Sequence, residues 1–301
     1  DIIISDNTVR NNASKGISVR HMLRCTGNVI SGNGVGFYGN GSGAFEGNHV
    51  LNNSGWGIEV NGSHAIKDNI ISGNTGGAIS YTARFNDGDF EPYEARASQV
   101  VSGNIIHNNT GSPVVYFYAQ NRIEYSGHNW LVFPMDHGLN YQFNQDDKVQ
   151  VSWAQRYVVP NSDFRNNTII GNSGSPTISL KQSPPNTGDY NPETSNLVFK
   201  NNNILNNDGV YVLKTENPLE TSAIDIENNY WGTTDASVIA AKVYDWNDDT
   251  SVGFVDYTPH ETSITVSNPI SPPSGVSGQT GPTTMQLSWT ANIESDIAGY
   301  K

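Results

Sequence analysis

Aromatic, acidic and basic side chains concentrate in three stretches of this 301-residue chain, near residues 84–97, 134–160 and 182–195. The first stretch places Asp87 and Asp89 between Arg84 and Tyr93. Aromatic rings offer flat, partly apolar faces, and carboxylates accept hydrogen bonds from hydroxyl groups, so this composition suits a sugar chain. The candidate substrate-binding residues in and between the stretches are Tyr93, Tyr116, Tyr118, Arg122, Tyr141, Trp153 and Arg156.

The same stretches allow catalytic alternatives. A uronate lyase or epimerase needs a base, an acid and a cation beside the uronate carboxylate, and His137, Arg84 and Lys181 have matching side chains. A glycoside hydrolase needs two carboxylates at a fixed separation, for which Asp87, Asp89 and Glu91 are the candidates. Sequence alone places none of these groups within reach of another. Whether the protein is an enzyme therefore stays open.

One acidic pattern suggests a metal. Asp245, Asn247, Asp249 and Asp256 fall at positions 1, 3, 5 and 12 of an EF-hand-like loop, the spacing that supplies oxygen ligands to Ca²⁺. Thr250 replaces the glycine usual at position 6, and the last ligand is Asp rather than Glu. The pattern makes Ca²⁺ the candidate cofactor.

An asparagine repeat sets the frame that must position these groups. Units such as Asn28-Val-Ile-Ser-Gly-Asn33 begin at Asn7, Asn28, Asn48 and Asn69, at intervals of 21, 20 and 21 residues. Further copies begin at Asn104, Asn129 (degenerate), Asn167, Asn202 and Asn228 (partial). A fixed period near 21 residues predicts a solenoid of about nine coils.

The residue types within each unit predict strands. Short β-branched runs separated by Gly and Asn are typical of strands joined by tight turns, and this much Gly and Asn opposes a helical repeat. In stacked coils the Asn amides can bond to one another along the stack. The aliphatic residue two positions after the first Asn should form an inward column: Val9, Ile30, Val50, Ile71, Ile106, Leu131, Ile169 and Ile204.

Three intervals exceed the period by 14, 17 and 14 residues: Asn69 to Asn104, Asn129 to Asn167, and Asn167 to Asn202. The extra residues begin at the same phase, just after the strand that follows the second Asn. Insertions in repeat proteins map to one side, often the binding side. We therefore expect the three stretches to wall one face of the solenoid.

The repeat resembles right-handed parallel β-helix proteins, in particular the NosD-like and pectate-lyase-like repeats of carbohydrate-binding proteins and sugar hydrolases. The resemblance covers residues 1–260. It implies an all-β right-handed parallel β-helix, a polysaccharide or cell-surface glycan as partner, and an extracellular or cell-surface location. The superfamily also contains lyases, epimerases, adhesins and inert scaffolds, so fold alone does not give the activity.

The C-terminal region departs from the repeat. Residues 235–244 predict a short helix that caps the last coil, with Val238, Ile239 and Val243 on its apolar face, and residues 252–259 predict a final strand. A Pro- and Ser-rich linker is expected over 261–275. Residues 276–301, with Met285-Gln-Leu-Ser-Trp-Thr-Ala-Asn292, resemble the beginning of a fibronectin type III domain.

The net charge and the short apolar runs limit the kinds of partner that we expect. The net charge of −13 and pI near 4.8 argue against nucleic acid, and no apolar run reaches the ~20 residues that cross a bilayer. The lone cysteine, Cys25, is expected in the core, and His49, His64 and His107 are expected to be solvated turn residues.

Three functional classes remain. A secreted or cell-surface module that binds polysaccharide is favoured. A structural protein such as an adhesin stalk, surface-layer or filament component, assembling through solenoid ends or edges, is the first alternative. A uronate lyase or epimerase is the second.

Overall fold

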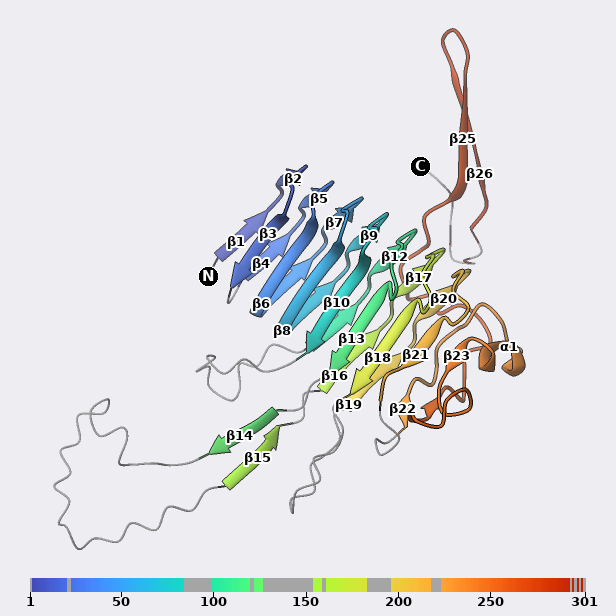
Figure 1. The fold of residues 1–301 in the computed structure, drawn as a ribbon. Helices are drawn as coiled ribbons and strands as arrows, with labels where there is room; N and C mark the ends of the chain where they lie inside the picture. Colours follow the sequence, from blue (N-terminus) through green and yellow to red (C-terminus); the bar gives the residue numbers. More distant parts are fainter. Residues whose placement is uncertain are drawn as a thin grey trace, which may run out of the picture.

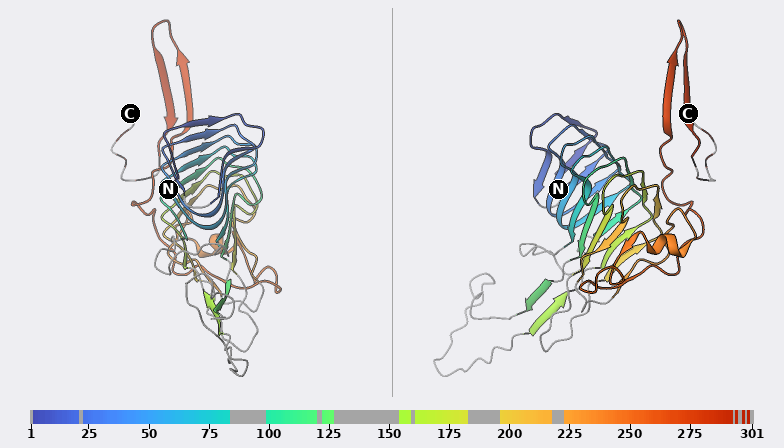
Figure 2. Two further views of the ribbon diagram at one scale, coloured as in Figure 1. Left: turned by 90° about the vertical axis from the view of Figure 1, so that its left-hand side faces the viewer. Right: turned by 45° about the vertical axis from the view of Figure 1, so that its right-hand side comes forward.

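Parallel β-strands make up nearly all regular structure of the protein, seen here in a computed structural model (Figure 1). The structure describes residues 2–20, 23–83, 99–119, 122–126, 154–158, 161–182, 196–217 and 223–292, together with 294, 297 and 299. Two long parallel sheets curl into a half-barrel around one apolar core, an arrangement consistent with a parallel β-helix (Figure 2).

The larger sheet, sheet A, has 13 strands among the described residues. They are β1 (Ile2–Ser5), β3 (Lys15–Arg20), β4 (Leu23–Thr26), β6 (Val35–Glu46), β8 (Trp56–Lys67), β10 (Gly77–Ala83), β11 (Gln99–Ser102), β13 (Val115–Ala119), β16 (Asn161–Arg165), β18 (Ile178–Gln182), β19 (Asn196–Lys200), β21 (Leu213–Thr215) and β23 (Val243–Tyr244). Sheet B has seven: β2 (Thr8–Arg10), β5 (Val29–Ser31), β7 (His49–Leu51), β9 (Ile70–Ser72), β12 (Ile105–His107), β17 (Thr168–Ile170) and β20 (Asn203–Leu205).

Sheet A bends into two arms. The long strands β6 and β8 run through both arms and turn at Gly41 and Gly62, whose φ angles are 109° and 115°. Such angles favour glycine, and a Cβ on Gly62 would lie 2.1 Å from the carbonyl oxygen of Gly41. Arm 1 continues through β3, β10, β13, β18, β21 and β23, whereas arm 2 contains β1, β4, β11, β16 and β19.

The predicted inward column is confirmed in sheet B. Strand register places Val9, Ile30, Val50, Ile71, Ile106, Ile169 and Ile204 one above another. All but the partly buried Val9 are buried in the core, and Leu131 lies outside the described residues. A second column in arm 2 includes Phe45, Phe164 and Phe199, and the rings of the last two stack at 4.8 Å.

The asparagines form two buried ladders. In each step the backbone N–H and the side-chain Nδ2 of one Asn donate to Oδ1 of the next, as between Asn48 and Asn69 at 2.8 and 3.1 Å. The first ladder runs through Asn7, Asn28, Asn48, Asn69, Asn104, Asn167, Asn202 and Asn229. The second runs through Asn12, Asn33, Asn53, Asn74, Asn109, Asn172 and Asn207. The predicted stacking role of these residues is confirmed.

Two details of the predicted repeat need correction. Asn104 bonds directly to Asn167, 63 residues later, so the degenerate copy at Asn129 adds no rung between them. Asn129 itself lies outside the described residues. In the last copy the rung is Asn229, while Asn228 adopts a positive φ of 57° at the turn.

Three neighbouring strands end in register before the segments that contain the predicted insertions. Strands β10, β13 and β18 are neighbours in arm 1, and their last residues, Ala83, Ala119 and Gln182, are in register. The chain therefore leaves sheet A at the same end of these three strands, and the second segment begins after Ala119 rather than at the predicted residue 134. Strands β14 (Arg122–Ser126) and β15 (Ala154–Val158) form a separate antiparallel pair between β13 and β16.

The predicted capping helix is shorter than expected. Helix α1 spans Ala236–Ala240, and the side chain of Asp235 caps its first turn by accepting from Ser237 N at 2.9 Å. Val243 leaves the helix to pair with Leu213 in sheet A, which ends the helix early. Ile239 and Val243 are buried as predicted, but Val238 is 45% exposed. The predicted final strand is reduced to β24 (Val255–Asp256), paired with β22 (Ile224–Asp225).

The segment after the cap folds back onto sheet B. Thr265 exchanges hydrogen bonds with Asn203, and the carbonyl oxygen of Pro269 accepts from Thr168 Oγ1 at 2.6 Å. These contacts cover the outer face of β17 and β20. Beyond them, β25 (Ser274–Thr280) and β26 (Met285–Thr290) form an exposed antiparallel hairpin that projects from the half-barrel (Figure 2).

One prediction concerns the ladder. Asn104→Leu removes the acceptor of Asn69 and the donors to Ile66, Ser102 and Asn167, and buried polar groups without partners each cost about 1–3 kcal/mol. We expect the free energy of unfolding, measured by urea denaturation, to fall by at least about 3 kcal/mol. Asn108→Gly is the control, because this exposed turn residue has a φ of 53° that glycine adopts freely. Equal losses in the two variants would contradict the ladder as the main polar constraint.

A second prediction concerns His64, which is buried in the core rather than solvated as expected. Its Nδ1 has no partner in the described structure, and burial lowers the pKa of His64 to about 4. The unfolded chain takes up this proton near the usual pKa of 6.5, so stability should be lost as pH falls from 6.5 towards 4, by up to about 3 kcal/mol. Urea midpoints measured across this range should decline less for His64→Leu. Parallel declines in the two proteins would refute the assignment.

Candidate functional site

The outer face of arm 1 carries a row of tyrosines and charged residues, here called the tyrosine face. Side chains alternate along a strand, so the residue that follows each of the buried Phe37, Ile58 and Ile79 points outward. Register aligns the outward residues of seven neighbouring strands in one row: Tyr38, Glu59, Ser80, Tyr116, Ser179, Lys214 and Tyr244. Tyrosine recurs at every third strand of this row, about 14 Å apart at the usual strand spacing.

A second row lies beside the first. Register aligns Arg20, Asn40, Asn61, Thr82, Tyr118 and Lys181 on the same face. Tyr116 and Tyr118 are two residues apart on β13, so they stand side by side near the middle of the face. Thr82, Tyr118 and Lys181 lie on β10, β13 and β18, the three strands after which the chain leaves sheet A. Asn61 lies on the neighbouring strand β8.

Lysines contact the tyrosine rings along this face. Lys15 Nζ lies 3.2 Å from the ring centroid of Tyr38, Lys181 lies 5.3 Å from Tyr118, and Lys214 lies 4.9 Å from Tyr244. A cation over a ring holds the ring in place and keeps a positive charge at the surface. The face therefore combines oriented aromatic rings with cations in a chain of net charge −13.

Two phenols of this face have a raised pKa. Burial, and next the negative charge of Glu216, raise the pKa of Tyr116. Glu216 accepts a hydrogen bond from Ser179 Oγ at 2.5 Å. At the end of the row Tyr244 donates to Asp249 at 3.1 Å, and this bond raises the pKa of Tyr244. Tyr116 and Tyr244 therefore remain neutral at pH 7.

The structure brings three of the predicted site residues together: Tyr116, Tyr118 and Lys181. Arg122 and Arg156 lie on the β14–β15 pair, where Arg122 is opposite Val158 and Arg156 is opposite Glu124. The remaining candidates, Arg84, Asp87, Asp89, Tyr93, His137, Tyr141 and Trp153, lie outside the described residues, so their roles stay predictions.

Sequence reasoning missed Tyr38, Lys15, Lys214 and Tyr244. For three of them the signal was strand alternation: Tyr38, Lys214 and Tyr244 directly follow the buried Phe37, Leu213 and Val243. Lys15, between Ser14 and Gly16, carries no such signal.

Glu59 and Glu216, two carboxylates of this face, do not form a hydrolase pair. Glu59 on β8 and Glu216 just after β21 are separated by four strand spacings, about 19 Å, whereas paired glycosidase carboxylates lie about 5–9.5 Å apart. No described histidine occupies either row. In the described part of the face, the tyrosines and lysines offer contacts to a ligand.

The predicted calcium loop is stabilised by hydrogen bonds of its own. Asp245 is buried and accepts from the backbone N–H of Asn247 and Val255 at 2.9 and 3.2 Å. Asp249 and Asp256 accept from Ser251 and Thr258 through similar local turns. Among the described residues no group of three or more His, Cys, Asp or Glu is placed to hold a metal. Ca²⁺ at this loop stays a prediction without support from the geometry.

No family model, curated protein or solved structure matches the chain in comparisons with known proteins. In the described residues no helix is long and apolar enough to span a membrane.

The lone thiol, Cys25, yields a direct test of the core. Its side chain is fully buried, as expected, and burial raises its pKa to about 12, so almost no thiolate forms at neutral pH. We expect no reaction with a thiol reagent at pH 8 in the native protein and full reaction after denaturation in urea. Rapid labelling of the native protein would contradict the buried position of Cys25.

Proposed function

We propose that the tyrosine face binds an extended polysaccharide. The recurrence of tyrosine at every third strand, in the register Tyr38, Tyr116 and Tyr244, carries the proposal. A chain lying across the strands, along the axis of the half-barrel, would meet a ring about every 14 Å. The recurrence suits a repetitive polymer better than a compact ligand.

The chemistry of the face supports a sugar as partner. Tyrosine offers an apolar ring face to the C–H groups of a sugar and a hydroxyl to its oxygens. Lys181, Lys214 and Glu216 add donors and acceptors beside the rings, and Asn61 and Thr82 extend the polar surface. Every member of the first row except the buried Ser179 is partly exposed, and such a row suits a long chain that makes many weak contacts.

We propose that the protein binds the polysaccharide without cleaving or altering it. Glu59 and Glu216 stand too far apart for hydrolysis, and of the predicted lyase or epimerase residues His137, Arg84 and Lys181 only Lys181 lies among the described residues. If no glycan binds, the alternative is a structural role as a stalk or filament component. We further propose that the protein acts outside the cell, since its partner would be found there.

We also propose a finer fold assignment. We assign residues 1–260 to a right-handed parallel β-helix, a proposal that rests on the stacked parallel strands of sheets A and B and the sequence resemblance. We assign residues 276–301 to the start of a fibronectin type III-like domain, a proposal that rests on the sequence resemblance; in the exposed hairpin β25–β26, Val276, Leu287 and Trp289 alternate with polar residues. Such a one-sided apolar hairpin is suited to the start of a β-sandwich.

The test is affinity electrophoresis against a panel of neutral and acidic polysaccharides, followed by titration with the best ligand. We expect Tyr116→Ala and Tyr118→Ala each to weaken binding about 10-fold, because each removes a ring from the centre of the face. The matched control is Trp289→Ala, which removes an exposed aromatic ring from the hairpin.

Binding that Trp289→Ala weakens as much as Tyr116→Ala would place the glycan elsewhere. Absence of retardation by every polysaccharide would overturn the proposal in favour of the structural role. Release of an unsaturated or epimerised product would require the lyase or epimerase alternative.

A further inference from the structure

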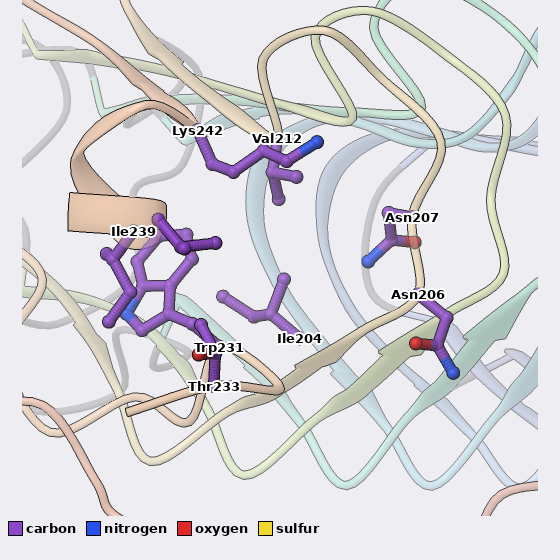
Figure 3. A pocket seen from close by; sticks show the side chains of 9 residues that line it. Ile204, Asn206, Asn207, Val212, Trp231, Thr233, Ile239 and Lys242 are labelled. Carbon is purple, nitrogen blue, oxygen red and sulfur yellow. The ribbon is translucent and has the colours of Figure 1, made fainter. Parts of the chain in front are cut away.

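A pocket lies where the second asparagine ladder meets the cap (Figure 3). Its volume is about 140 Å³, close to that of the ~150 Å³ protein cavities that admit one benzene ring. Ile204, Val212 and Ile239 form apolar walls together with Trp231. Asn207 and Lys242 supply polar groups, and none of the described lining residues is acidic. The pocket is thus separate from the tyrosine face in both position and chemistry.

Asn207 is the last rung of its ladder. Its Oδ1 accepts both donors of Asn172, each at 3.0 Å. By the same geometry its own backbone N–H and Nδ2 are directed towards the next position along the ladder. In the described structure neither donates to a further Asn, and Nδ2 bonds only to the carbonyl oxygen of Ile169 at 3.0 Å. Figure 3 shows the amide nitrogen of Asn207 directed into the pocket.

The other ladder ends differently. Asn229 Nδ2 donates to the carbonyl oxygens of Phe199 and Ile226, at 2.8 and 2.6 Å. Its amide is therefore used within the protein. The contrast shows that donors remain for a ligand at the end of the second ladder. A single acceptor oxygen there would take the place that Oδ1 of the next Asn takes in the other rungs.

Two further groups favour a particular ligand. Lys242 Nζ makes one hydrogen bond, to the carbonyl oxygen of Gly209 at 3.3 Å, and an ammonium group has three donors. Trp231 presents an aromatic ring that is 9% exposed, and its Nε1 has no partner in the described structure. A positive charge beside converging N–H donors favours a carboxylate, and the indole favours a flat or ring-shaped body.

We propose that this pocket binds a small ring-bearing carboxylate. One carboxylate oxygen accepts from Asn207, the charge lies near Lys242, and the ring packs against Trp231 and Ile239. Aromatic acids and single uronic acids share this chemistry. The size of the pocket excludes more than one ring. The inference does not depend on the tyrosine face, and either proposal can fail alone.

The test is ligand-observed NMR with the full chain, using benzoate and galacturonate as probes and benzyl alcohol and galactose as their neutral counterparts. We expect at least one carboxylate to bind, and its neutral counterpart to bind at least fivefold more weakly. Lys242→Gln should weaken carboxylate binding at least fivefold. Lys67→Gln, on the outer face of β8, is the matched control and should leave binding unchanged.

Val238→Trp provides a second variant if Lys242→Gln fails to fold. Val238 is 45% exposed on α1 and lines the pocket, so a larger side chain there should block entry without disturbing the core. We expect it to abolish the binding. Absence of binding by both carboxylates, equal binding of the neutral counterparts, or undiminished binding by folded Val238→Trp would each overturn the proposal.

Discussion

Each asparagine of the ladders except the last of each directs two donors, its backbone N–H and its Nδ2, at a single oxygen of the next rung. The backbone N–H fixes the position of the turn, and the side-chain Nδ2 fixes its spacing from the neighbouring coil. Because these groups are buried, a rung that slipped by one residue would leave several donors and acceptors without partners. The aliphatic columns and the strand registers therefore depend on the ladders. So does the alignment of the tyrosines on the outer face.

The inward and outward positions of the strands carry different residue types because of this constraint. Inward positions repeat apolar residues, because stacking like on like fills the core without gaps. Outward positions are free of that requirement, and arm 1 uses them for Tyr, Lys and Glu at a regular spacing. The cap interrupts the second ladder but not arm 1, where Val243 still points inward and Tyr244 outward. A helix of five residues lies where the next coil would continue that ladder, and Asn207 faces a pocket instead.

Much of the architecture could be predicted from sequence because its signals are local. Asn at fixed spacing, Gly at the turns and an aliphatic residue two positions later indicated the strands, the core column and the edge at which the insertions begin. The site was harder to predict. Tyr38 and Tyr244 are 206 positions apart in sequence, and only strand register places them in one row. The false rung at Asn129 and the solvated His64 show the same limit, because a motif does not reveal whether its neighbours stack upon it.

The direct bond between Asn104 and Asn167 shows that two rungs can be neighbours in space although a long segment of chain connects them. The residues between these rungs number about three times those of an ordinary coil, yet the ladder geometry is the same on both sides. By loop-closure entropy a threefold longer connection costs only about 1 kcal/mol. The scaffold can therefore accept foreign segments at this edge at little thermodynamic cost. In evolution, as in protein engineering, such a frame permits specificity to be exchanged by grafting loops while the supporting coils stay unchanged.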